Sequence, residues 1–314
     1  MKKIVFALMM LAVPLAAYGG SYDVYVDIDN NTGTEDGTRD HPYNTITEGV
    51  EAASNKNENH RKIFVYNGQY REKVKIEKDV ELYGQDKNKT IIYGKDSSGD
   101  EFSYAVKMKN GSKIRNFTIK YGKTGILVDE DCKATIKKCK IKKSDKIGVE
   151  VLRADRNDKK IFTLEDSKVY DGDGKALYIR KRKIFIEENK IYDNDQEGID
   201  LRSKVKGKIY DNEIYGNGES GIEFEVRRAK LKIKDNKIKS NKGSGINAQY
   251  RGKNPPGEIL VIDNSIRKNS DFGLRCSRPQ GGTPPIDYFS SSITLLENVF
   301  EKNDDGIFSQ MCHM

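Results

Sequence analysis

Three stretches of this chain repeat one pattern: IEENKIYDNDQEGI at residues 186–199, IYDNEIYGNGESGI at 209–222 and IKDNKIKSNKGSGI at 233–246. Each has an apolar residue, an Asn three positions later, a second apolar residue two further on, a second Asn after three more, and then Gly-Ile. The pattern continues at 261–274, at 295–307 with one residue fewer before its Gly, and in weaker form from Ile114, Ile136 and Leu164. A repeat of about 22–24 residues predicts a stack of eight similar coils.

The repeat predicts short strands rather than helices. Its apolar residues occur in fragments divided by Asn or Gly, and no segment keeps a 3.6-residue period over ten residues of helix formers. Asn and Gly tolerate the left-handed backbone conformation that tight corners need. A short strand can bury its inward side chain only against a neighbouring coil, as in a solenoid. We therefore expect an all-β, right-handed, single-stranded parallel β-helix.

Two kinds of column follow from that fold. The inward isoleucines should stack inside the solenoid, namely Ile191, Ile214, Ile238 and Ile266. The Asn residues at one corner should lie about 4.8 Å apart, so that their amides form a hydrogen-bonded ladder. These are Asn189, Asn212, Asn236, Asn264 and Asn298. We interpret the Asn columns as structural, not catalytic.

The chain begins with the features of a secretory signal peptide. Lys2 and Lys3 precede an apolar run from Ile4 to Ala17, and Ala17-Tyr18-Gly19 is typical of a cleavage site. We expect residues 1–19 to be removed and the mature chain to be secreted or periplasmic. Residues 20–110 should form an N-terminal cap and the first coils, and residues 111–314 the regular coils of the same domain.

A short capping helix is expected near the N-terminus. Ile46, Gly49, Val50 and Ala53 lie on one helical face, and Thr45 is a plausible N-cap. Such a helix would cover the open end of the solenoid, where strand edges are otherwise bare. Strand-like runs follow at 62–66, 74–76, 80–83 and 90–93.

Charge and cysteine content narrow the class of protein. The net charge is +8, or +6 without Lys2 and Lys3, which favours anionic partners: acidic polysaccharide, a charged cell surface or nucleic acid. Charged residues make up 33% of the chain, so mixed charge that merely solvates the surface is the alternative. Four cysteines do not make a disulfide-rich scaffold, although Cys276 and Cys312 could pair in an oxidising compartment. The cysteines and histidines have no metal-type spacing.

The segment from Gly37–Tyr43 (GTRDHPY) through Asn44-Thr45-Ile46 to Gly68–Val74 (GQYREKV) resembles the N-terminal part of many pectin-lyase-like β-helix proteins. That group includes pectate lyases, pectin methylesterases and uncharacterised secreted repeat proteins. With the Asn and Gly-Ile coils, the resemblance covers nearly the whole mature chain. We find no match to the Asp-containing catalytic motifs of the methylesterases. The polygalacturonase set of Asn-Thr-Asp, Asp-Asp, Gly-His-Gly and Arg-Ile-Lys is also missing, so the resemblance implies the fold and no catalytic residue.

Coil length predicts where a site could lie. Three coils carry extra residues between the Gly-Ile strand and the next coil, roughly at 153–160, 250–258 and 277–289. All three insertions should project from one edge of the solenoid, and loops on a rigid scaffold are where binding groups concentrate. Drift in length at a tolerant corner is the alternative.

Beside that edge, side chains of the Gly-Ile strand should alternate between the core and the surface. One outward column would then contain Glu150, Tyr178, Asp200, Glu223, Asn247, Arg275 and Phe308. The second would contain Arg180, Arg202, Glu225, Gln249, Ser277 and Gln310.

Asp200 and Glu223 should therefore be neighbours, and adjacent like charges destabilise a sheet unless something offsets them. Salt bridges from Arg180, Arg202 and Arg227 are one explanation. A Ca²⁺ ion held by Asp200, Glu223 and Glu225 is a second, because Ca²⁺ favours convergent oxygen ligands. A catalytic carboxylate pair, spaced as in a retaining glycosidase, is a third.

Carboxylates and arginines beside basic loops also suit a polyuronate lyase. A cation would neutralise the substrate carboxylate, and Arg180, Arg202 or Arg227 would remove the adjacent proton. The candidate catalytic residues are thus Arg180, Arg202, Asp200 and Glu223. The candidate substrate-binding residues are Glu150, Arg153, Tyr178, Arg227, Asn247, Gln249, Arg251 and Arg275.

Two weaker signals lie elsewhere. Tyr170, Tyr192 and Tyr215 recur once per coil and could receive sugar rings, although we favour packing on one another. The run 171–174 (DGDG) lacks the spacing of an EF-hand loop.

Two functions remain open: a protein that binds, or binds and cleaves, an acidic polysaccharide, and a non-enzymatic surface or envelope protein with a structural or adhesive role. A nucleic-acid role ranks last, because acids interrupt the basic residues and no binding motif is present.

Overall fold

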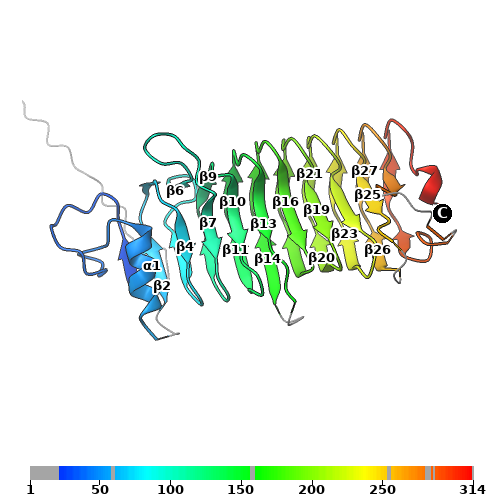
Figure 1. Ribbon diagram of the computed structural model, residues 1–314. Coiled ribbons are helices and arrows are strands. Elements are labelled where there is room, and N and C mark those ends of the chain that lie inside the picture. The colour runs from blue at the N-terminus through cyan, green and yellow to red at the C-terminus, as the bar shows by residue number, and fades with distance from the viewer. Residues whose placement is uncertain are drawn as a thin grey trace, which may run out of the picture.

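In the computed structural model, the chain forms an elongated solenoid of three long parallel sheets (Figure 1). The structure describes residues 21–57, 61–155, 160–252, 256–279, 284–285 and 287–312. Sheets A, B and C contain eleven, ten and nine strands, and the chain visits them in that order in each coil. Each strand pairs in parallel with its counterparts in the neighbouring coils, so the predicted parallel β-helix is confirmed.

The strand bounds show how short the elements are. Sheet A consists of β1 (Val24–Val26), β2 (Lys62–Val65), β5 (Glu81–Gly84), β8 (Lys113–Arg115), β11 (Ala134–Lys137), β14 (Ile161–Glu165), β17 (Lys183–Glu187), β20 (Lys206–Tyr210), β23 (Lys230–Lys234), β26 (Glu258–Ile262) and β29 (Ile293–Leu296). Sheet B consists of β3 (Gly68–Tyr70), β6 (Thr90–Tyr93), β9 (Thr118–Lys120), β12 (Lys140–Lys142), β15 (Lys168–Tyr170), β18 (Lys190–Tyr192), β21 (Glu213–Tyr215), β24 (Lys237–Lys239), β27 (Ser265–Arg267) and β30 (Val299–Glu301). Sheet C consists of β4 (Val74–Ile76), β7 (Tyr104–Met108), β10 (Thr124–Val128), β13 (Ile147–Val151), β16 (Lys175–Arg180), β19 (Ile199–Arg202), β22 (Ile222–Glu225), β25 (Ile246–Gln249) and β28 (Leu274–Ser277).

The core lies along the axis of the solenoid. Ile191, Ile214, Ile238 and Ile266 pair in register on sheet B and are fully buried, as the repeat predicts. Such columns gain their stability by removing apolar area from water, at roughly 25 cal/mol per Å².

Two Asn ladders line the corners on either side of sheet B. At the first corner, the Nδ2 of Asn189 donates to the Oδ1 of Asn212, which donates in the same way to Asn236, and the chain of bonds continues to Asn264 and Asn298. The second Asn of each coil forms a matching ladder from Asn194 to Asn303. The ladder prediction is confirmed.

The backbone conformation at these corners differs from our expectation. The left-handed residue is not the Asn but the one before it, for example Glu188, Asp211 and Asp235 with φ of 57°, 53° and 56°. The reason is geometric, because the Asn side chain must turn inward to reach the next coil, and the residue before it takes the strained turn.

The two ends of the solenoid are closed differently. Helix α1 (Ile46–Ser54) packs its buried face on the first strands, and Thr45 and Glu48 form a capping box at its start, as expected for a cap. At the other end, the 3₁₀ helix η2 (Gln310–Cys312) is joined to β28 by a disulfide between Cys312 and Cys276. The apolar side chains of Leu296, Val299 and Ile307 in the last coil are exposed.

The three insertions all connect sheet C to sheet A, after β13, β25 and β28, so they share one edge of sheet C as predicted. Parts of each lie outside the described residues. A further loop, between β6 and β7, follows sheet B and reaches the opposite edge of sheet C. The sequence pattern missed it because the first coils lack the repeat. The predicted signal peptide lies outside the described residues.

Candidate functional site

The outward face of sheet C carries the predicted column of polar side chains. The register places Glu150 beside Tyr178, Tyr178 beside Asp200, Asp200 beside Glu223, Glu223 beside Asn247 and Asn247 beside Arg275. In the second column Arg180 lies beside Arg202, Glu225 lies beside Gln249, and Gln249 lies beside Ser277.

The C-terminal end of both predicted columns is wrong. Phe308 lies opposite Leu274 rather than Arg275, and Gln310 belongs to η2 instead of a strand. The last copy of the repeat is one residue shorter, and the chain there forms η2, which the disulfide joins to β28, so the spacing no longer fixes the register.

Five charged side chains form a compact cluster at the centre of this face, which we call the carboxylate cluster: Lys175, Glu197, Asp200, Arg202 and Glu223. The Lys175 Nζ lies 2.8 Å from the Glu197 Oε2 and 2.5 Å from the Asp200 Oδ2. The Arg202 guanidinium donates to Asp200 at 3.0 Å and also bonds Glu223. The salt-bridge interpretation of the Asp200–Glu223 pair is therefore confirmed for Arg202, with Lys175 as the second cation.

The cluster is buried although it points away from the core. The Asp200 side chain is 0% exposed and that of Glu197 4%, because the longer side chains of Lys175 and Arg202 fold over them. Burial of this kind strengthens each ion pair and makes any unpaired charge costly.

Three carboxylates face two cations, so one negative charge is in excess. Burial and the neighbouring carboxylates raise the pKa of Glu223, and burial raises that of Asp200. Burial alone would raise the pKa of Glu197 too, but the Lys175 ammonium holds it below its usual value. Against the effect of burial, the carboxylates raise the pKa values of Lys175 and Arg202, which keeps both cations charged.

Glu197, Asp200 and Glu223 could together hold a metal ion. One oxygen from each lies within 4.8 Å of the others, and these hard oxygen donors suit Ca²⁺. Glu225, which we expected in this set, lies outside it: its Oε2 accepts from the Ser203 amide, and its Oε1 is 3.7 Å from the Arg251 Nε. The donors fit Ca²⁺ in type but supply only part of the roughly six to eight oxygens that it takes, and the ion could enter only if Lys175 and Arg202 turned away.

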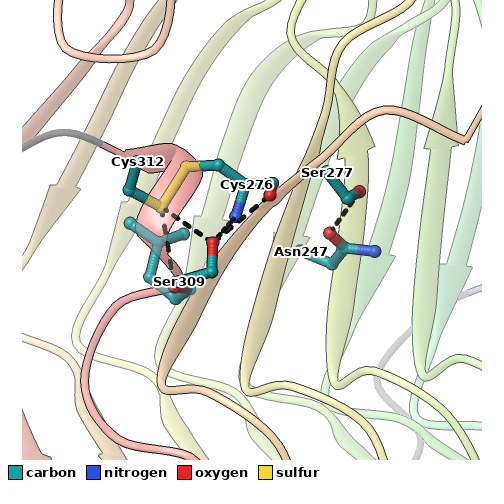
Figure 2. The surroundings of a disulfide bond; sticks show 6 residues. Asn247, Cys276, Ser277, Ser309 and Cys312 are labelled. Atoms are coloured by element: carbon teal, nitrogen blue, oxygen red, sulfur yellow. Dashed lines mark hydrogen bonds between the residues drawn. A yellow bond between two sulfur atoms is a disulfide. The ribbon is translucent and has the colours of Figure 1, made fainter. Parts of the chain in front are cut away.

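The cluster is connected by hydrogen bonds to a pocket further along the same face. The Asn247 Nδ2 donates to the Glu223 Oε2 at 2.5 Å, and Arg202 donates to the Gln249 side chain. Ser277 donates to the Asn247 Oδ1 at 2.8 Å, next to the Cys276–Cys312 disulfide (Figure 2).

These amides line a pocket of about 880 Å³ that also includes Phe272, Arg275 and Phe308. The Arg275 side chain is 48% exposed and bonds Asp271 at 2.8 Å. The pocket thus combines two exposed cations, Arg275 and Arg278, with the Asp305 carboxylate, several amide and hydroxyl groups and two aromatic rings.

The remaining predicted residues are spread around this site. Glu150 pairs with Arg180 at 3.8 Å, and the Tyr178 ring lies between the cations of Lys175 and Arg180, 5.7 and 5.5 Å from its centroid. Arg153 is exposed and pairs with Asp155 at 3.1 Å, away from the cluster.

Arg227 lies beyond the end of β22 beside Tyr288, and among the described residues it makes no ion pair with the cluster. Arg251 contacts Glu225 and Gln249, so it belongs to the rim of the site.

Sequence reasoning missed Lys175 and Glu197. Both precede the Gly-Ile strand that we used to align the coils, and the backbone bonds around Ala176 and Gly198 place them opposite each other. Carrying the alignment two residues further towards the N-terminus would have found both.

The comparisons with known proteins agree on the fold. The chain matches a family model described as a right handed beta helix region over residues 104–256, and the pectinesterase family model over residues 30–114. The pectinesterase match ends well before the carboxylate cluster. None of the curated proteins matches this sequence.

Similar solved structures include a pectate lyase, 14% identical, with a TM-score of 0.66 over 89% of this chain and 80% of that one. The pectin methylesterase of Erwinia chrysanthemi is 13% identical, with a TM-score of 0.52 over 90% of each chain. The pectin methylesterase of carrot is also 13% identical, with a TM-score of 0.51 over 92% of this chain and 89% of that one. From the sheet order, the corner ladders and these likenesses together, the chain has the right-handed parallel β-helix fold of the pectin lyase-like proteins.

Proposed function

We propose that the outward face of sheet C, from the carboxylate cluster to the pocket at Arg275, binds an acidic polysaccharide. The observation that carries the proposal is the pocket itself. Arg275 could receive the carboxylate of an acidic sugar, while Asn247, Gln249 and Ser277 offer hydrogen bonds to its hydroxyls. Aromatic rings among a few placed polar groups are the usual composition of such sites. The pectate lyase and pectin methylesterases of similar fold support this substrate class.

The carboxylate cluster would hold the pocket in shape. Arg202 orients Gln249, Glu223 orients Asn247, and buried Asp200 fixes Arg202. In this proposal Asp200 is a positioning residue, because its buried side chain does not reach a ligand. The excess negative charge of the carboxylate cluster would repel a polyuronate. A Ca²⁺ ion held by Glu197, Asp200 and Glu223 would offset that charge, but only in a state in which Arg202 has left Asp200 and no longer orients Gln249.

A finer proposal is cleavage by β-elimination. A base would remove the proton next to the substrate carboxylate, and the glycosidic oxygen would leave from the adjacent carbon, producing an unsaturated sugar end. Arg202 is poorly suited as the base, because the carboxylates raise its pKa and keep it protonated. Arg180 is the better candidate, because among the described residues it forms one ion pair, with Glu150 at 3.8 Å.

The disulfide supports a site outside the cytoplasm. Such bonds persist in oxidising compartments, and the Cys276–Cys312 bond adjoins the pocket. Together with the signal-like residues 1–19, it supports a secreted or periplasmic protein. Among the described residues, no helix is both long and apolar enough to cross a membrane.

The second candidate is a structural or adhesive protein without catalysis. One observation favours it: each carboxylate of the cluster is buried and forms an ion pair with Lys175 or Arg202, so none is exposed as an acid or base. The two candidates differ in whether the sheet C face binds an acidic polysaccharide.

The test is calorimetric titration with short galacturonate oligomers, with and without Ca²⁺, beside an assay for an ultraviolet-absorbing product. We expect binding that is lost in Arg275→Ala and kept in Arg115→Ala, a matched substitution on sheet A. A product that disappears in Arg180→Ala would establish the lyase. Binding without product would support the binding site and exclude the lyase. No binding of any acidic oligomer at low salt would refute the proposal and leave the structural candidate.

A further inference from the structure

The outward face of sheet B carries a large excess of positive charge. From β9 to β27, its two outward columns hold eight cations and a single carboxylate, Glu213. The cations are Lys120, Lys140, Lys142, Lys168, Lys190, Lys237, Lys239 and Arg267. They recur at the spacing of successive strands, about 4.8 Å.

Few of these cations are neutralised. Glu213 is paired with Lys190 at 3.0 Å, and Arg267 with Glu301 at 3.4 Å. Among the described residues, Lys168 and Lys237 form no ion pair. Burial, together with the like charges of Lys168 and nearby lysines, lowers the pKa of Lys140, which shows that the cations repel one another.

The carboxylates at the corner before sheet B do not balance this face. These carboxylates follow the strands of sheet A. Two of them, Asp235 and Asp263, pair with Lys234 of β23 in sheet A, at 2.6 and 3.4 Å. The outward columns of sheet B therefore carry more cations than their own carboxylate balances, and Asp171 and Asp193 are the nearest carboxylates at the corner that follows the sheet.

The tyrosines on this face do not offer ring surfaces to a ligand. Tyr170, Tyr192 and Tyr215 stack with centroids 4.9 Å apart and planes within 6°. The two ends of the stack are covered by ammonium groups, Lys142 at 5.6 Å and Lys239 at 5.5 Å. Both faces of every ring are thus used within the protein, which leaves ring edges and hydroxyls for contact.

We propose that the sheet B face is a second binding site, for a linear anionic polysaccharide lying along the solenoid axis. A polymer with one carboxylate or sulfate per sugar matches a row of cations repeated once per coil, and the tyrosine hydroxyls can bond its sugar hydroxyls. Single-stranded nucleic acid fits less well, because such sites rely on bases stacking on open aromatic faces. The inference does not depend on the sheet C pocket, since the two sheets form different faces of the solenoid.

The test measures the affinity of long polygalacturonate at about 50 and about 200 mM NaCl. We expect Lys168→Gln/Lys237→Gln to bind about five- to tenfold more weakly at the lower salt concentration, as the loss of two exposed attractions would give. Lys208→Gln/Lys232→Gln removes the same charge from sheet A and should bind like the wild type. Equal melting temperatures would show that both variants fold.

Three results would overturn the inference: no loss in the sheet B variant, an equal loss in both variants, or stronger competition by a single-stranded DNA of similar charge. Arg275→Ala separates this site from the sheet C pocket. If short oligomers do not bind at all while the long polymer still depends on Lys168 and Lys237, the sheet B site stands and the proposed function fails.

Discussion

Glu223 carries the excess negative charge of the carboxylate cluster, and its pKa is raised by burial and by Asp200 and Glu197. When folding raises the pKa of a carboxyl, the protonated group favours the folded state. Its contribution to the free energy of unfolding is therefore present in acid and lost as the pH rises through the raised pKa. We therefore expect Glu223→Gln to melt at a higher temperature than the wild type at neutral pH, with the difference vanishing in acid.

The matched control has the opposite sign. Lys190 holds the pKa of Glu213 below its usual value, so that carboxylate stabilises the fold above its ordinary titration range and loses the effect in acid. Glu213→Gln should lower the melting temperature at neutral pH. Melting curves across pH in the presence of EDTA would measure both, and a Glu223→Gln variant less stable than the wild type at neutral pH would contradict the charge count.

Calcium gives a second residue-level prediction. If Ca²⁺ replaces Lys175 and Arg202 between the three carboxylates, millimolar Ca²⁺ should raise the melting temperature, and Asp200→Ala should abolish that shift. Asp195→Ala, an exposed carboxylate of the same coil, should keep it. An unchanged wild-type melting temperature would leave the cluster as a set of salt bridges.

The sequence predicted the Asp200–Glu223 contact because alternation and coil length suffice to place neighbours on a strand. It could not predict the burial of Asp200, which depends on how the long side chains of Lys175 and Arg202 fold over it. Whether a carboxylate touches a ligand or only positions another group is therefore not contained in the repeat.

At the level of the corners, the ladder should be weakest at its end. The Asn212 side chain accepts from Asn189 and donates to Asn236 and to the Ile186 carbonyl, so Asn212→Ala leaves buried groups on two coils without partners. Each buried group left unpaired costs about 1–3 kcal/mol.

Asn298 has no coil beyond it and is only partly buried, so Asn298→Ala should cost less than Asn212→Ala. Urea unfolding would compare the two variants. If both variants lost the same free energy of unfolding, the ladder bonds of an Asn to the coils on its two sides would not add to its contribution.

At the scale of strands and loops, the sequence repeat predicts some features of the structure and misses others. The three insertions were placed at one edge because each lengthens a recognisable coil. The loop between β6 and β7 was missed, because the coils before residue 111 keep apolar strands but not the Asn and Gly-Ile signature. The left-handed residue before each Asn was missed as well, since the repeat tolerates Glu, Asp, Lys or Ser there.

At the scale of the whole molecule, the fold follows from the repeat because every coil solves the same packing problem against its neighbours. The register fails only in the last coil, where Phe308 moves by one position. In the part of the chain that the structure describes, no further coil stacks on this one, and the Cys276–Cys312 disulfide joins the chain to β28 there.

In a solenoid each coil contacts only its neighbours, so the coils can unfold one after another from the less stable end. Helix α1 blocks one end, so the unfolding should begin with β29 and β30. The disulfide joins Cys276 and Cys312, 36 residues apart, so β29 and β30 lie within the loop that it closes. It therefore opposes their separation from the rest of the solenoid. We expect a mild reductant to speed amide hydrogen exchange in residues 293–301 while β21 and β2 keep their rates, as mass spectrometry of the exchanged protein would show. After reduction of the disulfide, local unfolding would spread next to β28, which carries Arg275. The redox state of this one bond would therefore determine whether the pocket stays folded.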